Sequence, residues 1–406
     1  MSLDKIEKQL SEKLQELSSS GTSKREEKII TGIKPAVDGF GPRYFLEGYS
    51  NNTFLRMNSN SYLGLEINAE VKKAEEQAAQ KYGCGPGAVR FICGTYQPHI
   101  ELEKRLAAFH QREAAMLFSA AYATVIGVLP QLINDETLII SDALNHNCII
   151  NAGRLARPAK KEVYPHLDMS RLEQILIENK GQVSRVCVVT DGVFSMRGDH
   201  APLDEINDCC RRHEVDYEQG IITVVDDSHG VGALGKTGRG TEEVTNAQAD
   251  VLIATLGKAM GVNGGYVVSN KILIDYLRET AASYIYSNPI TPAEAAAANK
   301  SLEIIDSQKG QQLLEILRQR IGQLRNGLEK LGYETLAGDH PVVPLMIRDT
   351  TKTAALVQYL FDHNILVTGL NYPVVPKGEE EVRLQVSVNH TEKDIDHFLV
   401  ILTNFK

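Results

Sequence analysis

Apolar residues follow two alternating spacings along most of this chain. Between about residues 60 and 300, short runs rich in β-branched residues alternate with stretches in which apolar residues recur at helical spacing. The strand-like runs are TLII at 137, RVCVVT at 185, IITVVDD at 221 and VLIATL at 251, and the helical stretches include 98–110, 168–179 and 203–214. This alternation predicts an α/β fold with a mostly parallel sheet that helices cover on both faces.

The two ends of the chain follow other patterns. Ile6, Leu10, Leu14 and Leu17 recur at helical spacing before the break SSSGTS, which predicts a short amphipathic helix that packs on a partner or on the other domain. Beyond Pro292, two long helical stretches lead to strands near 342–347, 365–368 and 381–388, with helices near 351–362 and 391–404, which together predict a smaller α+β domain. We expect an N-terminal helix and extended segment over 1–57, a large domain over 58–295 and a small domain over 296–406.

Charge and cysteine content narrow the class of protein. A formal net charge of −9 argues against nucleic acid or an acidic membrane surface as a partner, because both would repel the chain. No run approaches the roughly 20 apolar residues that span a bilayer, and the N-terminus lacks a signal-peptide core. The 6 cysteines form no C-x-x-C pair, so they indicate free thiols rather than a zinc site or disulfides. The prediction is a cytoplasmic protein without a metal centre.

One glycine-rich motif points to nucleotides. The stretch from Gly230 to Thr237 satisfies both G-x-x-x-x-G-K-[ST] and G-x-G-x-x-G, and it follows a strand, as a P-loop or dinucleotide site would. Either site needs a helix that begins at the last motif residues, so that its N–H groups face the phosphates. Here Gly238-Arg239-Gly240 follows instead, and four polar residues separate the strand from the loop. We keep a P-loop nucleotide-binding protein as the rival hypothesis.

Three residues near two strand ends predict a different chemistry. Lys258 follows the apolar strand VLIATL among small residues, where burial would lower its pKa and favour the neutral, nucleophilic amine. Asp226 ends the strand IITVVD, and ligands of open α/β sheets bind beyond such ends. His229 follows three residues later. A lysine for a Schiff base, an acid for the pyridine nitrogen and a histidine for the ring hydroxyl are what pyridoxal 5'-phosphate (PLP) requires.

Two further features fit the same cofactor. His146 lies after the strand TLII, where its flat ring could stack on the cofactor, although a lone histidine is more often an ordinary polar group. Ser119-Ala120-Ala121-Tyr122 leads into a helix at about 122–133, whose free N–H groups would bind a phosphate. A simple serine N-cap explains that start equally well.

With these residues placed, the chain resembles the α-oxoamine synthases over nearly its whole length, and among them most closely the 2-amino-3-ketobutyrate CoA ligases, or glycine C-acetyltransferases. The resemblance lies in long, specific strings. They are NSNSYLGL (58–65), AVRFICGT (88–95), HIELEKRLAAF (99–109), SDALNH (141–146), TDGVFSM (190–196), VVDDSHGVGALGKTGRG (224–240), TLGKA (255–259), YPVVPKG (372–378) and VRLQVSVNHT (382–391).

The resemblance implies PLP fold type I, with a seven-stranded sheet in the large domain, and a homodimer with a shared active site. It also implies roles that the residues alone do not supply. Asn60 and Arg383 match positions that bind the amino-acid carboxylate, for which a planar guanidinium is suited. The cofactor positions that match the family are Ala121, Tyr122, His146, Ser195, Asp226, His229, Thr255 and Lys258, with Ser287 and Asn288 reaching the phosphate from the opposite subunit.

The reaction that the resemblance implies is acyl transfer from a thioester to a small amino acid, glycine being favoured, or the reverse cleavage of 2-amino-3-ketobutyrate. Lys258 would carry the proton transfers. The acyl carrier is CoA or a carrier protein. A related synthase that makes 8-amino-7-oxononanoate, 5-aminolevulinate or a long-chain ketone is the alternative, and a PLP scaffold that has lost its activity is a further one.

Overall fold

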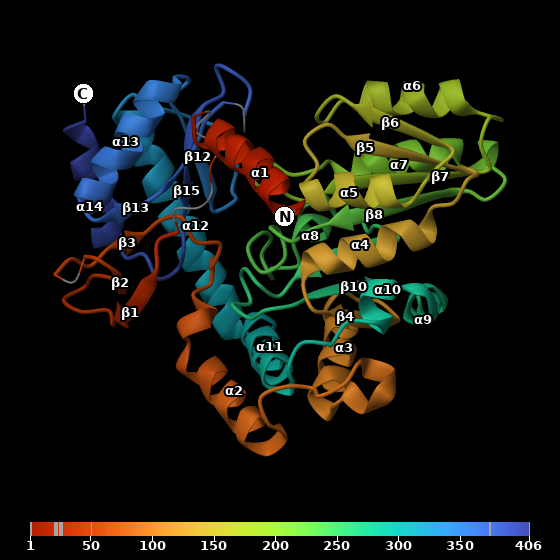
Figure 1. Ribbon diagram of the computed structural model, residues 1–406, viewed down its shortest axis with the longest axis horizontal. Helices are drawn as coiled ribbons and strands as arrows, with labels where there is room; N and C mark the ends of the chain where they lie inside the picture. Colours follow the sequence, from red (N-terminus) through yellow and green to blue (C-terminus); the bar gives the residue numbers. More distant parts are fainter. Residues whose placement is uncertain (1, 20–22, 24–26, 50, 373–374, 406) are drawn as a thin grey trace.

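The computed structural model describes residues 2–19, 23, 27–49, 51–372 and 375–405, and it contains a large and a small sheet (Figure 1). The large sheet has seven strands, and its inner strand β10 is antiparallel to both neighbours while the other paired strands are parallel. The predicted fold type is confirmed. In spatial order the strands are β4 (Ala114–Phe118), β10 (Gly265–Ser269), β9 (Val251–Thr255), β8 (Ile221–Asp226), β7 (Arg185–Asp191), β5 (Thr137–Asp142) and β6 (Lys160–Tyr164).

Helices cover both faces of the large sheet, because its central strands are apolar on both sides. One face packs against α4 (Ala121–Leu132), α5 (Asn147–Leu155) and α9 (Lys271–Thr280). The other packs against α6 (Met169–Asn179), α7 (Leu203–His213), α3 (Gln97–Phe109) and α11 (Pro292–Ile305). The remaining helices of this region are α2 (Ala69–Tyr82), α8 (Thr241–Thr245) and α10 (Ala282–Ile285).

The small sheet is antiparallel and lies towards the C-terminus. Its strands, in order, are β11 (Glu334–Thr335), β12 (Val342–Met346), β15 (Glu381–Gln385) and β14 (Thr368–Leu370). The long helix α12 (Gln308–Lys330) leads into it from α11, and α13 (Thr350–Asp362) and α14 (Glu392–Thr403) complete the layer.

Two strand predictions in this region are wrong in detail. The single strand predicted over 365–368 is two strands, because β13 (Ile365–Leu366) pairs with β3 (Leu55–Arg56) while β14 pairs with β15. The strand predicted over 381–388 ends at Gln385. Beyond it the backbone bonds elsewhere: Val386 N donates to Pro341 O and Val388 N to Tyr62 O.

The extended N-terminal segment packs on the C-terminal region. Strands β1 (Ile30–Lys34) and β2 (Arg43–Leu46) form a hairpin before β3. A buried ion pair of 2.5 Å joins Arg43 Nη2 to Asp394 Oδ1 in α14. The predicted domain boundaries after residues 57 and 295 stay a proposal.

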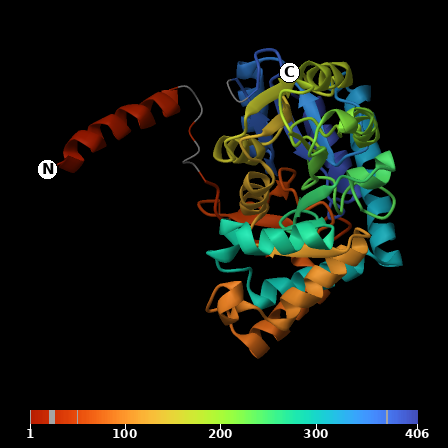
Figure 2. The same cartoon turned by 90° about the vertical axis from the view of Figure 1, so that its right-hand side faces the viewer.

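The predicted N-terminal helix is present as α1 (Ser2–Ser19), but it does not pack on the other domain. Figure 2 shows it standing away from the rest of the chain, and Leu3, Ile6, Leu10 and Leu14 are 41–56% exposed. Its packing on a partner stays a prediction. Ser20, Gly21 and Thr22 of the predicted break, like Pro373 and Val374 of the string at 372–378, lie outside the described residues. No described helix combines the length and apolarity that a membrane span needs.

The polar residues of interest collect at one edge of the large sheet. Asp142, Asp191, Asp226 and Thr255 are the last residues of β5, β7, β8 and β9, which are parallel and adjacent. Ligands of open α/β sheets bind at this edge, beyond the carboxyl ends of the strands.

Candidate active site

A cavity of about 250 Å³ opens at the carboxyl ends of β8 and β9. It brings together most of the residues that the sequence singled out. Its walls are formed by Ala121, Tyr122, His146, Cys148, Asp191, Val193, Ser195, Asp226, Ser228, His229, Thr255 and Lys258.

Lys258 lies in the turn that follows β9, on the wall of the cavity. Burial lowers the pKa of its ammonium group to about 8, although the charges of Asp226 and Asp191 oppose that shift. A lysine with this pKa exchanges its proton near neutral pH, as a nucleophile and a proton carrier must.

Asp226 presents one oxygen that is well bonded and one that is not. Oδ1 accepts hydrogen bonds from Ser228 N at 3.1 Å and from Ser228 Oγ at 2.5 Å. Oδ2 accepts only from the weak thiol donor of Cys148, at 3.5 Å, among the described residues. The carboxylate is therefore held in place by one oxygen while the other retains capacity for a cationic N–H group.

His229 connects the cavity to the predicted carboxylate-binding pair. Its Nδ1 lies 2.7 Å from the hydroxyl of Tyr62, which in turn lies 3.3 Å from Asn60 Oδ1. Arg383 Nη2 donates to the same Asn60 oxygen at 3.1 Å. Burial, and then the charges of Lys258 and Arg383, hold the pKa of His229 well below its usual range, so the ring is neutral. Asn60 and Arg383 do not line the cavity, but these hydrogen bonds connect them to His229 on its wall.

His146 begins α5 and stands on the cavity wall. Its backbone N donates to Asp191 Oδ2 at 2.9 Å, and its Nδ1 accepts from Cys148 N at 3.3 Å and lies 2.9 Å from the Cys148 thiol. Burial lowers the pKa of the His146 ring, although the negative charge of Asp226 acts to raise it. Burial and the charge of Asp226 raise the pKa of Cys148, so a neutral thiol separates the histidine from the aspartate.

The start of α4 provides unoccupied donors at the same cavity. Ala120 is its N-cap and offers no side-chain acceptor, so the alternative of a serine N-cap is wrong. The first N–H groups of a helix then remain free for an anion. Ala121 and Tyr122 from this turn, Ser195 and Thr255 all line the cavity, which suits a phosphate group.

The remaining cofactor positions lie elsewhere. Ser287 and Asn288 are exposed, follow α10 and do not line the cavity of their own chain. Conversely, sequence reasoning did not single out Cys148, Asp191 and Ser228. Asp191 ends a strand as Asp226 does, so the same signal could have found it, whereas nothing in the sequence marks Cys148 as a neighbour of Asp226.

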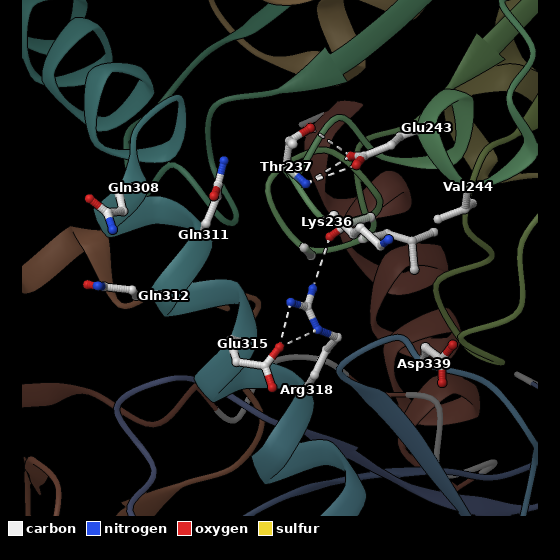
Figure 3. Close-up of a pocket in the computed structure, with 13 residues that line it drawn as sticks. Lys236, Thr237, Glu243, Val244, Gln308, Gln311, Gln312, Glu315, Arg318 and Asp339 are labelled. Atoms are coloured by element: carbon white, nitrogen blue, oxygen red, sulfur yellow. Dashed lines mark hydrogen bonds and ion pairs between the residues drawn. The ribbon is translucent and has the colours of Figure 1, made fainter.

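The nucleotide-like loop binds the side chain of Glu243 from the following helix, α8 (Figure 3). Glu243 accepts from Thr237 N at 2.9 Å, from Thr237 Oγ1 at 2.9 Å and from Arg239 N at 3.0 Å. These are the donors that a P-loop would offer to a phosphate. The helix that follows, α8, has only 5 residues and begins at Thr241, beyond the motif. An internal carboxylate thus fills the place of the anion, and the P-loop hypothesis loses its structural support.

Comparisons with known proteins agree with this geometry. Residues 52–402 match the family described as aminotransferase class I and II. An 8-amino-7-oxononanoate synthase of Thermosipho melanesiensis is 38% identical over 85% of this chain and 86% of that protein, and the human mitochondrial 2-amino-3-ketobutyrate coenzyme A ligase is 37% identical over 94% and 88%. The chain is an α-oxoamine synthase. The resemblance to this family is confirmed, but the two relatives match to a similar extent and do not separate their activities.

Solved structures extend the comparison to the α-oxoamine synthase fold and its cofactor. A serine palmitoyltransferase of Sphingomonas wittichii superposes with a TM-score of 0.87 at 25% identity, over 99% of this chain and 97% of that one. A high-resolution serine palmitoyltransferase structure with PLP superposes equally well, with a TM-score of 0.87. The cofactor of this α-oxoamine synthase is PLP.

The residues present fit PLP. Lys258 would hold the cofactor covalently through Nζ, Asp226 Oδ2 would accept from the pyridine nitrogen, and the free N–H groups of α4 with Thr255 would bind the phosphate. When bound, PLP supplies an electron sink for the charge that develops at the α-carbon of an amino acid. The buried Nε of Arg383 has no hydrogen-bond partner among the described residues, which leaves a donor for a substrate carboxylate.

Proposed function

We propose that this α-oxoamine synthase transfers the acyl group of a CoA thioester to the α-carbon of glycine or another small amino acid, with release of CoA. With glycine and acetyl-CoA the product is 2-amino-3-ketobutyrate, and the reverse reaction cleaves that compound. The observation that carries the proposal is that Lys258, with its lowered pKa, lines the same cavity as Asp226 and His229, and that His229 is linked through Tyr62 and Asn60 to Arg383.

Each residue has a role in this proposal. Arg383 and Asn60 orient the amino acid by its carboxylate, and Lys258 accepts the α-proton and later returns it. Asp226 would favour the protonated form of the pyridine nitrogen, and that positive charge would stabilise the negative charge that develops at the α-carbon. His229 donates to the ring oxygen while Tyr62 holds its orientation, and His146 supplies a flat wall.

The size of the site supports a small amino acid. A cavity of about 250 Å³ lies below the usual range of ligand sites, roughly 300–1,000 Å³, and the cofactor itself needs part of that space. The second candidate is a synthase that takes a longer acyl group, as an 8-amino-7-oxononanoate synthase does. Its support is the similarity to such a protein from Thermosipho melanesiensis, which is about equal to the similarity to the ligase.

A substrate panel distinguishes the two candidates. Glycine, alanine and serine are each combined with acetyl-CoA and pimeloyl-CoA, and thiol release is followed at fixed enzyme concentration. The proposal predicts the highest kcat/KM for glycine with acetyl-CoA. Preference for pimeloyl-CoA with another amino acid would establish the second candidate, and no thiol release with any pair would contradict both.

Replacing Arg383 by alanine is expected to raise the KM for the amino acid roughly 10- to 100-fold, the worth of charge-assisted hydrogen bonds to a carboxylate, with a smaller effect on kcat. Initial rates at varied amino-acid concentration measure this effect. Arg211→Ala is the control, because Arg211 is exposed and its contacts are local, an ion pair with Asp208 and a hydrogen bond to Asn207 O. An unchanged KM in Arg383→Ala would remove the arginine from the carboxylate site.

We also propose that the enzyme is a homodimer in which Ser287 and Asn288 complete the phosphate site of the other subunit. Both residues are exposed, and the neighbouring Tyr286 is 79% exposed although it is a large aromatic side chain. A second copy that covers this loop would bury that surface.

A further inference from the structure

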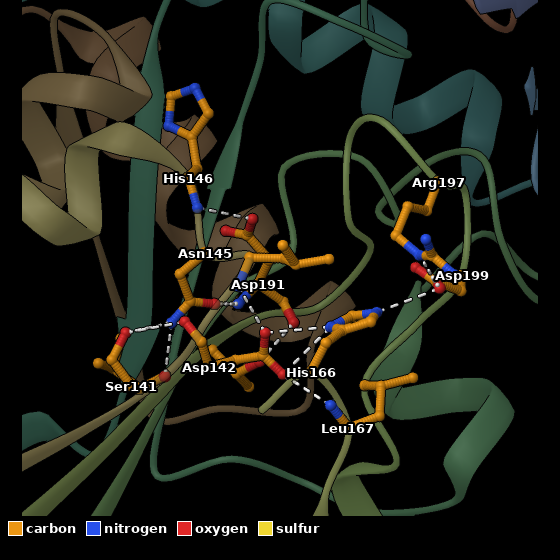
Figure 4. Close-up of polar contacts among 12 residues, drawn as sticks. Ser141, Asp142, Asn145, His146, His166, Leu167, Asp191, Arg197 and Asp199 are labelled. Atoms are coloured by element: carbon orange, nitrogen blue, oxygen red, sulfur yellow. Dashed lines mark hydrogen bonds and ion pairs between the residues drawn. The ribbon is translucent and has the colours of Figure 1, made fainter. Parts of the chain in front are cut away.

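A further histidine, His166, lies outside the cavity and bridges two carboxylates, Asp142 at the end of β5 and Asp199 in the loop after β7 (Figure 4). His166 follows β6. Its Nδ1 lies 3.0 Å from Asp142 Oδ1, and its Nε2 lies 3.2 Å from Asp199 Oδ2. The ring also packs edge-on against Phe194, with centroids 4.3 Å apart.

This geometry requires a doubly protonated ring. A neutral imidazole has one N–H donor and one lone pair, so one of its nitrogens would face a carboxylate without a proton between them. The imidazolium ion has two N–H groups and can donate to Asp142 and Asp199 together. The Asp142 side chain is fully buried, so a missing donor there would be costly.

The bridge joins the two loops that shape the cofactor cavity. Asp142 ends β5, and its Oδ1 accepts from Leu144 N at 2.8 Å in the turn that leads to His146. Asp199 closes the loop of residues 193–200, where Phe194 N donates to Asp199 O at 3.0 Å. That loop carries Val193 and Ser195 on the cavity wall.

The same network continues to the carboxylate beside Lys258. Asn145 Oδ1 accepts from Asp191 N at 2.8 Å, and Asp191 Oδ2 accepts from His146 N at 2.9 Å. His166 does not line the cavity. Loss of its proton or of its side chain would therefore alter the cavity wall indirectly, through Asp142 and through Asp199.

We propose that His166, as an imidazolium ion, is a positioning residue that ties the Ser195 loop to the end of β5 and so limits cofactor binding at alkaline pH. The inference deepens the proposed function and rests on PLP binding in the cavity.

The charges around His166 set the direction of the pH dependence. Burial alone would lower the pKa of His166, but the hydrogen bonds and charges of Asp142 and Asp199 raise it to about 9. Arg197 donates from Nε to the same Asp199 Oδ2 at 2.9 Å. Burial and the charge of Asp142 raise the pKa of Tyr164 on β6, which stays neutral. Because the pKa is raised above its unfolded value of about 6.5, the bridge is complete below that pH and is lost as the pH rises through about 9.

Replacing His166 by glutamine tests the inference, with the PLP dissociation constant measured by cofactor absorbance between pH 6 and pH 10. The wild-type protein is expected to lose affinity for PLP, beyond the effect of Lys258 titration, as the pH rises through about 9. His166→Gln is expected to bind PLP roughly tenfold more weakly at pH 7, because one charge-assisted hydrogen bond is lost. Its PLP dissociation constant is expected to change less between pH 7 and pH 10 than that of the wild type, because the variant has no imidazolium ion to deprotonate. Titration of Lys258 affects both proteins alike, so the difference between them isolates His166.

His213→Gln is the matched control, because His213 also lies between two carboxylates, Glu173 and Asp216, but at the end of α7 away from the cavity. It is expected to follow the wild-type curve. If His166→Gln does not fold, Asp199→Asn tests the inference instead. It removes one of the two carboxylates that raise the pKa of His166, so the loss of PLP affinity should begin at a lower pH. Curves that coincide with the wild type in His166→Gln, or an unmoved alkaline loss in Asp199→Asn, overturn the inference. A wild-type protein that does not bind PLP at any pH would instead reject the proposed function.

Discussion

Replacing Lys258 by alanine is expected to lower kcat by a factor on the order of 10⁴, the upper range for loss of a general acid–base group. Among the described residues, Lys258 is the one lysine on the cavity wall, and burial brings its pKa down to about 8. Thiol release from the preferred acyl-CoA measures the effect. Folding should be unchanged, because removing a partly buried ammonium group relieves a desolvation cost.

Lys236→Ala is the matched control for Lys258→Ala. Lys236 is the lysine of the nucleotide-like motif, and the next residue of that loop, Thr237, donates to Glu243. The account predicts wild-type activity for Lys236→Ala. The P-loop hypothesis predicts the opposite pattern, with function dependent on Lys236 and indifferent to Lys258, and that pattern would contradict the account.

Asp226→Asn is expected to lower kcat by roughly 10²–10³, the usual cost of removing one preorganised electrostatic contact with the developing charge. Asparagine keeps the size of the side chain and an acceptor for Ser228, so the fold should persist. What is lost is the negative charge that favours a protonated pyridine nitrogen. Steady-state kinetics at saturating PLP measure the effect and separate it from weaker cofactor binding.

Asp250→Asn serves as the control for that charge. Asp250 accepts from Thr223 N at 2.7 Å and from Thr223 Oγ1 at 2.9 Å, near the opposite end of β8. It is expected to affect stability rather than kcat. Equal kcat values for Asp226→Asn and the wild type would show that the carboxylate does not act on the cofactor.

The sequence predicted the parts of the fold where pattern and environment agree. β7, β8 and β9 are buried on both faces, so their continuous apolar runs were clear signals. β6 has the sequence KKEVY, and most of its side chains are exposed because it lies at the edge of the sheet. Its sequence therefore contains no apolar run from which a strand could be predicted. The chain between 365 and 370 changes partners within a few residues, and a local pattern cannot specify which strand each residue pairs with.

The same distinction holds for the site. Asp226 is the last residue of β8, and His229 and Lys258 lie three residues beyond the ends of β8 and β9, where topology alone brings them together. Tyr62 and Cys148 were missed because their roles depend on contacts between distant segments: Tyr62 reaches His229 across 167 positions, and Cys148 reaches Asp226 across 78. His166 is a lone histidine in the sequence, and only the fold shows that it lies between two carboxylates.

The most direct measurement is the position at which PLP becomes fixed to the chain. The protein is reconstituted with PLP and reduced with borohydride, which makes the bond between cofactor and lysine permanent, and its peptides are then analysed by mass spectrometry. The account predicts a single modified peptide that carries the phosphopyridoxyl group on Lys258. An unmodified Lys258, or a label spread over exposed lysines such as Lys236, would contradict it.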